Sequence, residues 1–134
     1  RWGGEEFLLV FRPLPRGGLA QIGQRLCSRI AEHDFDLGNG QRHRLTVSAG
    51  LIECPLFPAY PRLLGWEQLV TLADRALYRA KNRGRNRWVA YRPATDAQLP
   101  DDLPHSGGDP WWLVEQGLLE MFDGEGRLYL ETVA

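Results

Sequence analysis

A turn that carries two carboxylates opens this sequence. Gly3 and Gly4 are followed by Glu5 and Glu6, and an apolar run at residues 7–11 comes directly after them. This pattern predicts the tip of a hairpin that leads into a buried strand. Because glycine has no Cβ, a phosphate can lie against such a turn, and the carboxylates can hold a divalent cation through oxygen. A plain hairpin turn with two solvated acids is the alternative for this motif alone.

A second group of reactive side chains falls on one face of a predicted helix. Asp74, Tyr78, Lys81 and Arg85 follow one another at steps of four, three and four residues. This spacing places them on one side of the helix, away from its leucine and alanine stripe. Lysine offers a point charge and arginine a planar fork, so Lys81 and Arg85 can clamp phosphate oxygens. Cations in a last helical turn also stabilise the helix dipole without a ligand, and this alternative stays open.

The apolar periodicity predicts the elements that position these two groups. In order, we expect a strand at 7–11, a helix at 19–33, a short hairpin turning at 38–40, a strand at 42–53, an irregular surface loop at 54–65, a helix at 67–83 and a strand at 88–91. Gly84 stands where a left-handed C-terminal cap is expected. The alternation of strands and helices predicts an α+β fold, an α/β sandwich with helices packed on a sheet.

The composition changes after residue 92. Residues 93–109 contain prolines, acids and two adjacent glycines without an apolar period, which predicts a linker. Asp109 and Pro110 suit the N-cap and first position of a helix, which we expect to run through Met121. A turn at 123–126 and a strand at 127–133 follow. We therefore divide the chain into residues 1–92, a linker at 93–109 and a small appendage at 110–134, in which two tryptophans cover apolar surface.

The overall composition is that of a soluble single domain, with 134 residues, 43% hydrophobic and 25% charged. A net charge of -1 provides no global attraction to nucleic acid or to an anionic membrane, so any phosphate must be held by local groups. Cys27 and Cys54 lack ligand-type spacing, which favours buried free thiols in a reducing compartment. No apolar run is long enough to span a membrane and no leader is visible. We expect a cytoplasmic segment with neither nucleic-acid nor membrane contact.

Three blocks of the sequence together resemble the GGDEF domain of bacterial diguanylate cyclases. They are Arg-Trp-Gly-Gly-Glu-Glu-Phe at 1–7, Thr-Val-Ser-Ala-Gly at 46–50 and the basic segment at 73–87, in the family's order and spacing. The resemblance covers residues 1 to about 92, and Gly-Gly-Glu-Glu-Phe is an accepted form of the signature. It implies a palm-like fold with a mixed or antiparallel sheet. It also implies that two GTP molecules, one on each domain of a homodimer, condense into cyclic di-GMP with release of pyrophosphate.

The same resemblance implies roles for single residues. Glu5 becomes a catalytic ligand of Mg²⁺ or Mn²⁺ that helps deprotonate the attacking 3′-hydroxyl, and Glu6 supports it within the turn. The two glycines become the backbone surface against the nucleotide. Lys81 and Arg85 contact its terminal phosphates. Arg25 matches a position that binds the product at an inhibitory site, and a solvated helix arginine is its alternative.

Features that the family carries ahead of its signature do not occur in this sequence. They are a strand with another metal-binding aspartate, two helices with guanine-recognising residues, and an Arg-x-x-Asp inhibitory motif. We therefore expect the C-terminal portion of the domain, starting mid-domain, inactive by itself, and with an unpaired sheet edge that invites pairing with another copy. The alternative function is a non-catalytic GTP or cyclic di-GMP binding module that regulates a neighbouring domain.

Overall fold

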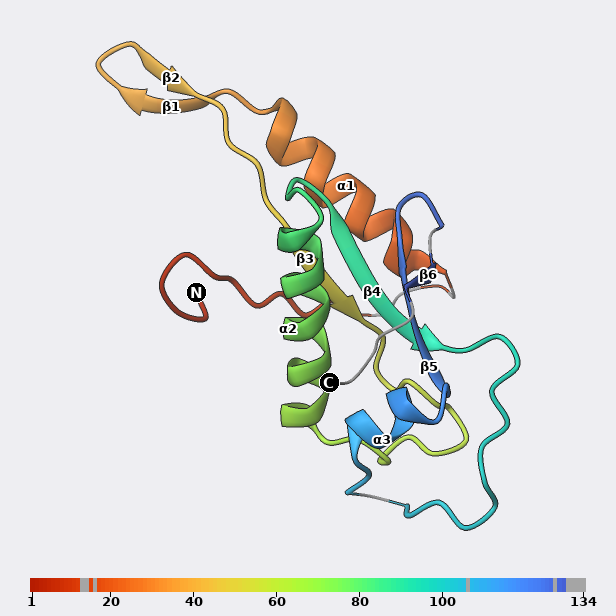
Figure 1. Ribbon diagram of the computed structural model, residues 1–134. Coiled ribbons are helices and arrows are strands. Elements are labelled where there is room, and N and C mark those ends of the chain that lie inside the picture. The colour runs from red at the N-terminus through yellow and green to blue at the C-terminus, as the bar shows by residue number, and fades with distance from the viewer. Residues whose placement is uncertain (13–14, 16, 106, 127, 130–134) are drawn as a thin grey trace.

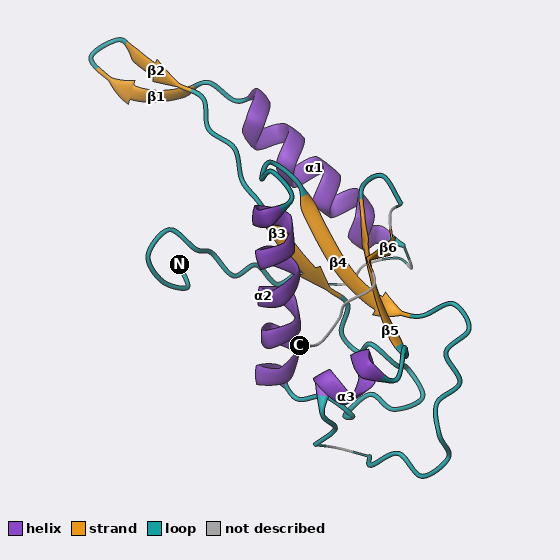
Figure 2. Ribbon diagram, viewed as in Figure 1, coloured by secondary structure: helices purple, strands orange, loops and turns teal. Residues whose placement is uncertain are grey.

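A computed structural model describes residues 1–12, 15, 17–105, 107–126 and 128–129. These residues form a mixed α and β structure, which confirms the predicted fold class (Figures 1 and 2). In order, the elements are α1 Gly18–Glu32, β1 Phe35–Gly38, β2 Gln41–His43, β3 Ala49–Ile52, α2 Trp66–Asn82, β4 Trp88–Pro93, α3 Pro110–Glu115, β5 Leu119–Asp123 and β6 Leu128–Tyr129. None of these helices has the length and apolar character needed to cross a membrane.

The main sheet has the strand order β3-β4-β5-β6. The helical connection through α2 makes β4 parallel to β3, with Ala49 opposite Trp88. β5 and β6 then pair antiparallel, so the sheet is mixed, as the resemblance implies. The predicted short hairpin is also present, because β1 and β2 form a separate two-stranded arm that projects from the body (Figure 1).

The two long helices cover opposite faces of the main sheet. A Cβ on Gly50 of β3 would overlap the Ala73 carbonyl oxygen of α2, whereas a Cβ on Gly23 of α1 would lie 2.7 Å from Cδ1 of Leu51. Successive residues of a strand point to opposite faces, so neighbours 50 and 51 mark the two sides. The glycine that ends the second sequence block therefore allows α2 to pack closely on β3.

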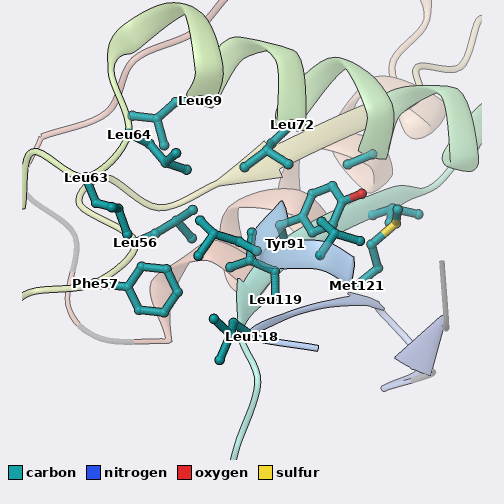
Figure 3. Packing of buried hydrophobic residues seen from close by; sticks show 14 of the residues in the cluster. Leu56, Phe57, Leu63, Leu64, Leu69, Leu72, Tyr91, Leu118, Leu119 and Met121 are labelled. Carbon is teal, nitrogen blue, oxygen red and sulfur yellow. The ribbon is translucent and has the colours of Figure 1, made fainter. Parts of the chain in front are cut away.

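The side chains of β4 alternate between two hydrophobic cores. Trp88 and Ala90 belong to the cluster beneath α1, and Val89 and Tyr91 belong to the larger cluster beneath α2. In Figure 3, Leu72 points from α2 toward the tyrosine, and Leu72 is fully buried. Full burial of such a side chain contributes about 1.5–3 kcal/mol, so this core fixes where α2 and its last turn lie.

The loop at 54–65 is irregular, as predicted, and most of its residues are exposed, but the expectation that it lies on the surface is only partly right. Leu56, Phe57, Leu63 and Leu64 all belong to the core beneath α2. Proline removes a ladder donor but does not prevent its neighbours from burying apolar side chains, so the loop closes one end of this core.

The prediction of two buried free thiols is half right. Cys27 and Cys54 are both unpaired, but only the first is buried. Burial raises the pKa of the Cys27 thiol, which keeps it protonated at neutral pH.

Two strand predictions differ from the structure. Residues 7–11 form no strand, and their side chains are exposed, with Phe7 at 71% and Val10 at 65%. A strand needs a neighbour to satisfy its backbone groups, and no strand of the described chain pairs with this run. The predicted strand at 42–53 is divided into β2 and β3, with no regular element at 44–48.

The C-terminal segment extends the main sheet. The described residues between 94 and 109 form no helix or strand, although several pack on the core. Asp109 caps α3 as predicted, accepting a hydrogen bond from the Trp111 amide at 2.9 Å. The helix ends earlier than predicted, because Gly117 adopts a left-handed φ of 69° and residues 119–123 become β5, paired with β4. The predicted turn at 123–126 is present.

The rest of the C-terminal prediction is only partly within the described residues. Part of the expected last strand is present as β6. Its remaining residues, 127 and 130–133, lie outside the described residues. Trp111 packs against the core beneath α2, whereas Trp112 is 37% exposed. The division of the chain into three parts stays a prediction.

Candidate functional site

The signature residues form the tight turn that their sequence predicts. The Glu6 amide donates to the Gly3 carbonyl at 2.8 Å, and the Gly3 amide donates back to the Glu6 carbonyl at 3.4 Å. Gly4, between them, has a φ of 52°, which is the left-handed conformation that favours glycine. Arg1 closes the turn from outside, since its Nε donates to the Gly4 carbonyl at 2.6 Å. The hairpin is thus present at its tip but does not continue into two strands.

The space beside the turn is open. A Cβ on Gly3 or on Gly4 would meet no other atom within 4 Å. Gly3 also lacks a positive φ, so neither packing nor backbone conformation in the described structure requires a glycine at this position. A backbone without side chains facing open space is available for close approach by a ligand.

The end of α2 carries the predicted cations on a well-defined cap. Gly84 has a φ of 110°, its amide donates to the Lys81 carbonyl, and the Arg85 amide donates to the Ala80 carbonyl at 3.1 Å. These two bonds form a Schellman motif, so the predicted left-handed cap is confirmed. Arg85 itself has a φ of 62°, and its carbonyl accepts from Nε of Arg87. The cap fixes the backbone of Arg85 relative to Lys81.

An ion pair joins the turn to the end of α2. Nζ of Lys81 lies 3.5 Å from Oε1 of Glu6, and both side chains are 42% exposed. In the ribbon, the N-terminal segment approaches α2 from the side (Figure 1). The structure therefore brings one of the two predicted cations to the glycine turn. Arg85 is exposed, and it makes no hydrogen bond or ion pair with the turn in the part of the chain that the structure describes.

Glu5 has the freedom that a metal ligand needs. Its side chain is exposed, and it forms no hydrogen bond or ion pair with any described residue. The described residues contain no group of three side chains that could enclose a metal ion by themselves. Mg²⁺ commonly uses one or two carboxylates together with substrate phosphates and water. The turn fits this open kind of site.

The other predicted residues make no hydrogen bond or ion pair with the turn in the part of the chain that the structure describes. Asp74 and Tyr78 are exposed on α2, as their spacing predicts, and the Arg75 guanidinium lies 5.4 Å from the Tyr78 ring centroid. Arg25 is exposed on α1. Because α1 covers the other face of the sheet, Arg25 is not part of the constellation around Lys81.

Two contacts of the site were missed by sequence reasoning. One is the pairing of Glu6 with Lys81, and the other is the closure of the turn by Arg1. The opposite charges of the first pair were visible, but nothing local shows that two distant residues meet. Arg1 directly precedes the motif in the sequence. A long side chain with hydrogen-bond donors next to a glycine turn was the signal that could have predicted this contact.

Comparison with known proteins gives an independent result. The family model described as "Diguanylate cyclase, GGDEF domain" matches residues 1–87. Diguanylate cyclase DosC of Escherichia coli strain K12 is 34% identical over 87 residues, which are 65% of this chain and 18% of the relative. Diguanylate cyclase DgcZ of the same strain is 32% identical over 87 residues, 65% of this chain and 27% of the relative.

A further relative and the solved structures complete the comparison. The uncharacterized protein YhcK of Bacillus subtilis strain 168 is 34% identical over 87 residues, 65% of this chain and 23% of that protein. The chain thus spans less than a third of the length of these three relatives. No solved structure matches it significantly.

Proposed function

This chain belongs to the GGDEF family of diguanylate cyclases, and we propose that the protein containing it condenses two GTP molecules into cyclic di-GMP with release of pyrophosphate. The observation that carries the proposal is the meeting of the glycine turn and the end of α2 at the Glu6–Lys81 ion pair. Each GTP is bound by one domain, and two copies face each other as a homodimer. Because the substrate is drawn from the cytoplasmic GTP pool, we place the domain in the cytoplasm.

The chain's own residues bind and orient the nucleotide. Gly3 and Gly4 form the backbone surface against it, which their open surroundings support. Lys81 and Arg85 hold the terminal phosphates and neutralise the charge that leaves with pyrophosphate. The cap at Gly84 keeps the two cations in a fixed backbone relation. Phosphoryl chemistry of this kind depends mainly on such positioning and neutralisation.

Glu5 is the residue that would hold Mg²⁺ or Mn²⁺, because its carboxylate is exposed and without a partner among the described residues. A bound divalent ion offsets the negative charge that develops on the attacking and leaving oxygens. Glu5 also accepts the proton of the attacking 3′-hydroxyl. Glu6 keeps the turn in place through its backbone bonds to Gly3 and its contact with Lys81.

Arg25 serves a separate purpose in this proposal. Its exposed place on α1, across the sheet from Lys81, suits a site where cyclic di-GMP binds without occupying the catalytic turn. Arg25→Ala is then expected to leave the initial rate unchanged and to weaken inhibition by added product. Unchanged inhibition would make Arg25 an ordinary solvated helix residue.

The proposal is tested by incubating the full-length protein with GTP and Mg²⁺ and following pyrophosphate and the cyclic product. Glu5→Ala is expected to lose at least about a hundredfold in rate, the scale of lost acid–base catalysis. Glu67→Ala is the matched control, because Glu67 is an equally exposed glutamate on the first turn of α2, away from the cations. Equal product from the Glu5 variant and the unchanged protein would remove Glu5 from the mechanism.

Two further results of the same experiment distinguish the alternatives. The 134-residue chain alone is expected to show no turnover, because its described part contains no group of three side chains that could hold a metal ion, and two ions need more ligands than the turn supplies. GTP binding by the full-length protein without any turnover would favour a regulatory nucleotide-binding module over a cyclase.

A further inference from the structure

We propose that the Glu6–Lys81 ion pair is a phosphate-responsive contact: a polyphosphate group draws Lys81 away from Glu6 and releases the Glu6 carboxylate. This inference rests on the proposed function, since it takes Lys81 to bind the Glu6 carboxylate in the unliganded protein and the nucleotide phosphates when they are present. It makes Lys81 a positioning residue for the turn as well as a phosphate contact.

The first support is that the turn has few polar attachments to the body of the molecule. Its backbone bonds, from Trp2, Gly3 and Glu6, are all internal to the turn, and so is the bond from Arg1 to Gly4. Within the described residues, the contact of Glu6 with Lys81 is the ion pair that joins residues 1–12 to α2. Breaking this pair therefore removes a tie between the turn and α2, and the internal hydrogen bonds of the turn can then open more often.

The second support is the weakness of the pair. The charged atoms are 3.5 Å apart and both side chains are 42% exposed, so water competes with the contact. Exposed pairs of this kind shift an equilibrium by at most about fivefold. A lysine ammonium is a compact charge on a flexible stem, which lets it move to a stronger anion. A polyphosphate carries several negative charges against the single charge of Glu6.

The third support is the position of Arg85. The Schellman cap sets its backbone close to that of Lys81, and its side chain is exposed. A phosphate chain that meets Arg85 therefore arrives beside Lys81. Once Lys81 turns to the phosphate, Glu5 and Glu6 both present free carboxylates. The turn would gain its second free carboxylate only when a polyphosphate is in place.

The experiment uses tripolyphosphate as the probe, in chelator and without divalent ions, and measures its affinity for the full-length protein by calorimetry. Glu6→Gln is expected to bind tripolyphosphate about two- to fivefold more tightly, because its Lys81 starts free. Glu5→Gln is the matched control, since it removes the same charge from the neighbouring residue without breaking the pair. Equal gains in the two variants would mean that general repulsion explains the effect and would overturn the inference.

Hydrogen exchange gives a second readout that needs no activity. In the unliganded protein, the Trp2 and Glu6 amides, which donate within the turn at 2.8 Å, are expected to exchange faster in Lys81→Met and in Glu6→Gln. Tripolyphosphate should produce the same acceleration in the unchanged protein. Exchange that is equal in all of these states would overturn the inference.

Failure of the proposed function would look different. If Lys81→Met bound tripolyphosphate as tightly as the unchanged protein, Lys81 would not be a phosphate contact. That result would contradict both the proposed phosphate site and the release of Glu6. Weaker binding in Lys81→Met, together with equal gains in Glu5→Gln and Glu6→Gln, would leave the phosphate site intact and overturn only the coupling.

Discussion

Gly50 of β3 and Ala73 of α2 pack backbone against backbone. A Cβ on Gly50 would overlap the Ala73 carbonyl oxygen, and it would also meet the Leu77 amide nitrogen. Both atoms belong to helix backbone, so they cannot move aside as a flexible side chain would. This contact sets the distance of α2 from the sheet, and with it the place of Lys81.

Gly50→Ala is therefore expected to destabilise the protein by at least about 3 kcal/mol, the upper end of the usual cost of overpacking. The free energy of unfolding from urea titrations followed by circular dichroism measures this loss. Gly3→Ala is the matched control, because a Cβ there meets nothing within 4 Å and no positive φ is involved. Similar urea midpoints for the two variants would contradict the close packing.

Arg85→Gly is expected to raise stability and weaken phosphate binding at the same time. The φ of 62° at Arg85 is costly for a residue with a Cβ, and glycine removes about 1 kcal/mol of this strain. The same change removes a guanidinium from the proposed phosphate contact. Melting temperature and tripolyphosphate affinity report the two effects separately.

Arg83→Gly is the control for the stability effect. Arg83 has an ordinary φ of -90°, so glycine relieves no strain there and is expected to lower stability. A lower melting temperature for Arg85→Gly as well would show that its left-handed backbone is not a source of strain.

The base of the β1–β2 arm is expected to be sensitive to acid. Nε of Arg44 donates to Oδ1 of Asp34 at 2.7 Å, and this hydrogen bond, with the charge of Arg44, holds the pKa of Asp34 below its usual value. A carboxyl with a lowered folded-state pKa stabilises the fold above its unfolded value of about 3.9. That contribution is lost as the pH falls through the lower folded-state pKa.

Arg44→Gln should return the Asp34 pKa toward its ordinary value, which carboxyl NMR titration measures directly. Arg42→Gln provides the comparison, because Arg42 lies opposite Asp36 in the arm and not beside Asp34. An Asp34 pKa that is the same in all three proteins would remove Arg44 as the cause of the shift.

The two thiols are expected to react at different rates. Cys54 is exposed, whereas Cys27 is buried and its pKa is raised by burial. The thiolate is the reactive form, so an alkylating reagent should modify Cys54 first under native conditions. Cys54→Ser should abolish the fast phase and keep the slow one. A fast phase that survives this change would place Cys27 within reach of solvent.

Local sequence signals predicted α1 and α2 and their ends well, and they predicted the start of α3 but not its end. Gly84 and Asp109 each act through hydrogen bonds to residues within a few positions, so the information lies next to them in the chain. The turn at Gly3 to Glu6 was predictable for the same reason. Apolar periodicity placed the two long helices because each has one buried stripe.

Other features depend on partners that are distant in sequence. The apolar run at 7–11 has the composition of a strand, yet a strand forms only where another strand satisfies its backbone. Leu63 is buried in the same core cluster as residues of β4 and α3, which loop composition does not reveal. The approach of Glu6 to Lys81 likewise requires the whole packing of α2 on the sheet.

The order of strands has a consequence for how this domain can be joined to others. The recognisable similarity stops at residue 87, immediately before β4, whose residues 88–91 are almost entirely buried between α1 and α2. A gene fusion or protein truncation placed at that limit would delete the strand that both helices share. Because β5 pairs with β4 over residues 119–123, we expect a tolerated junction to lie beyond β5, outside the residues that match the family.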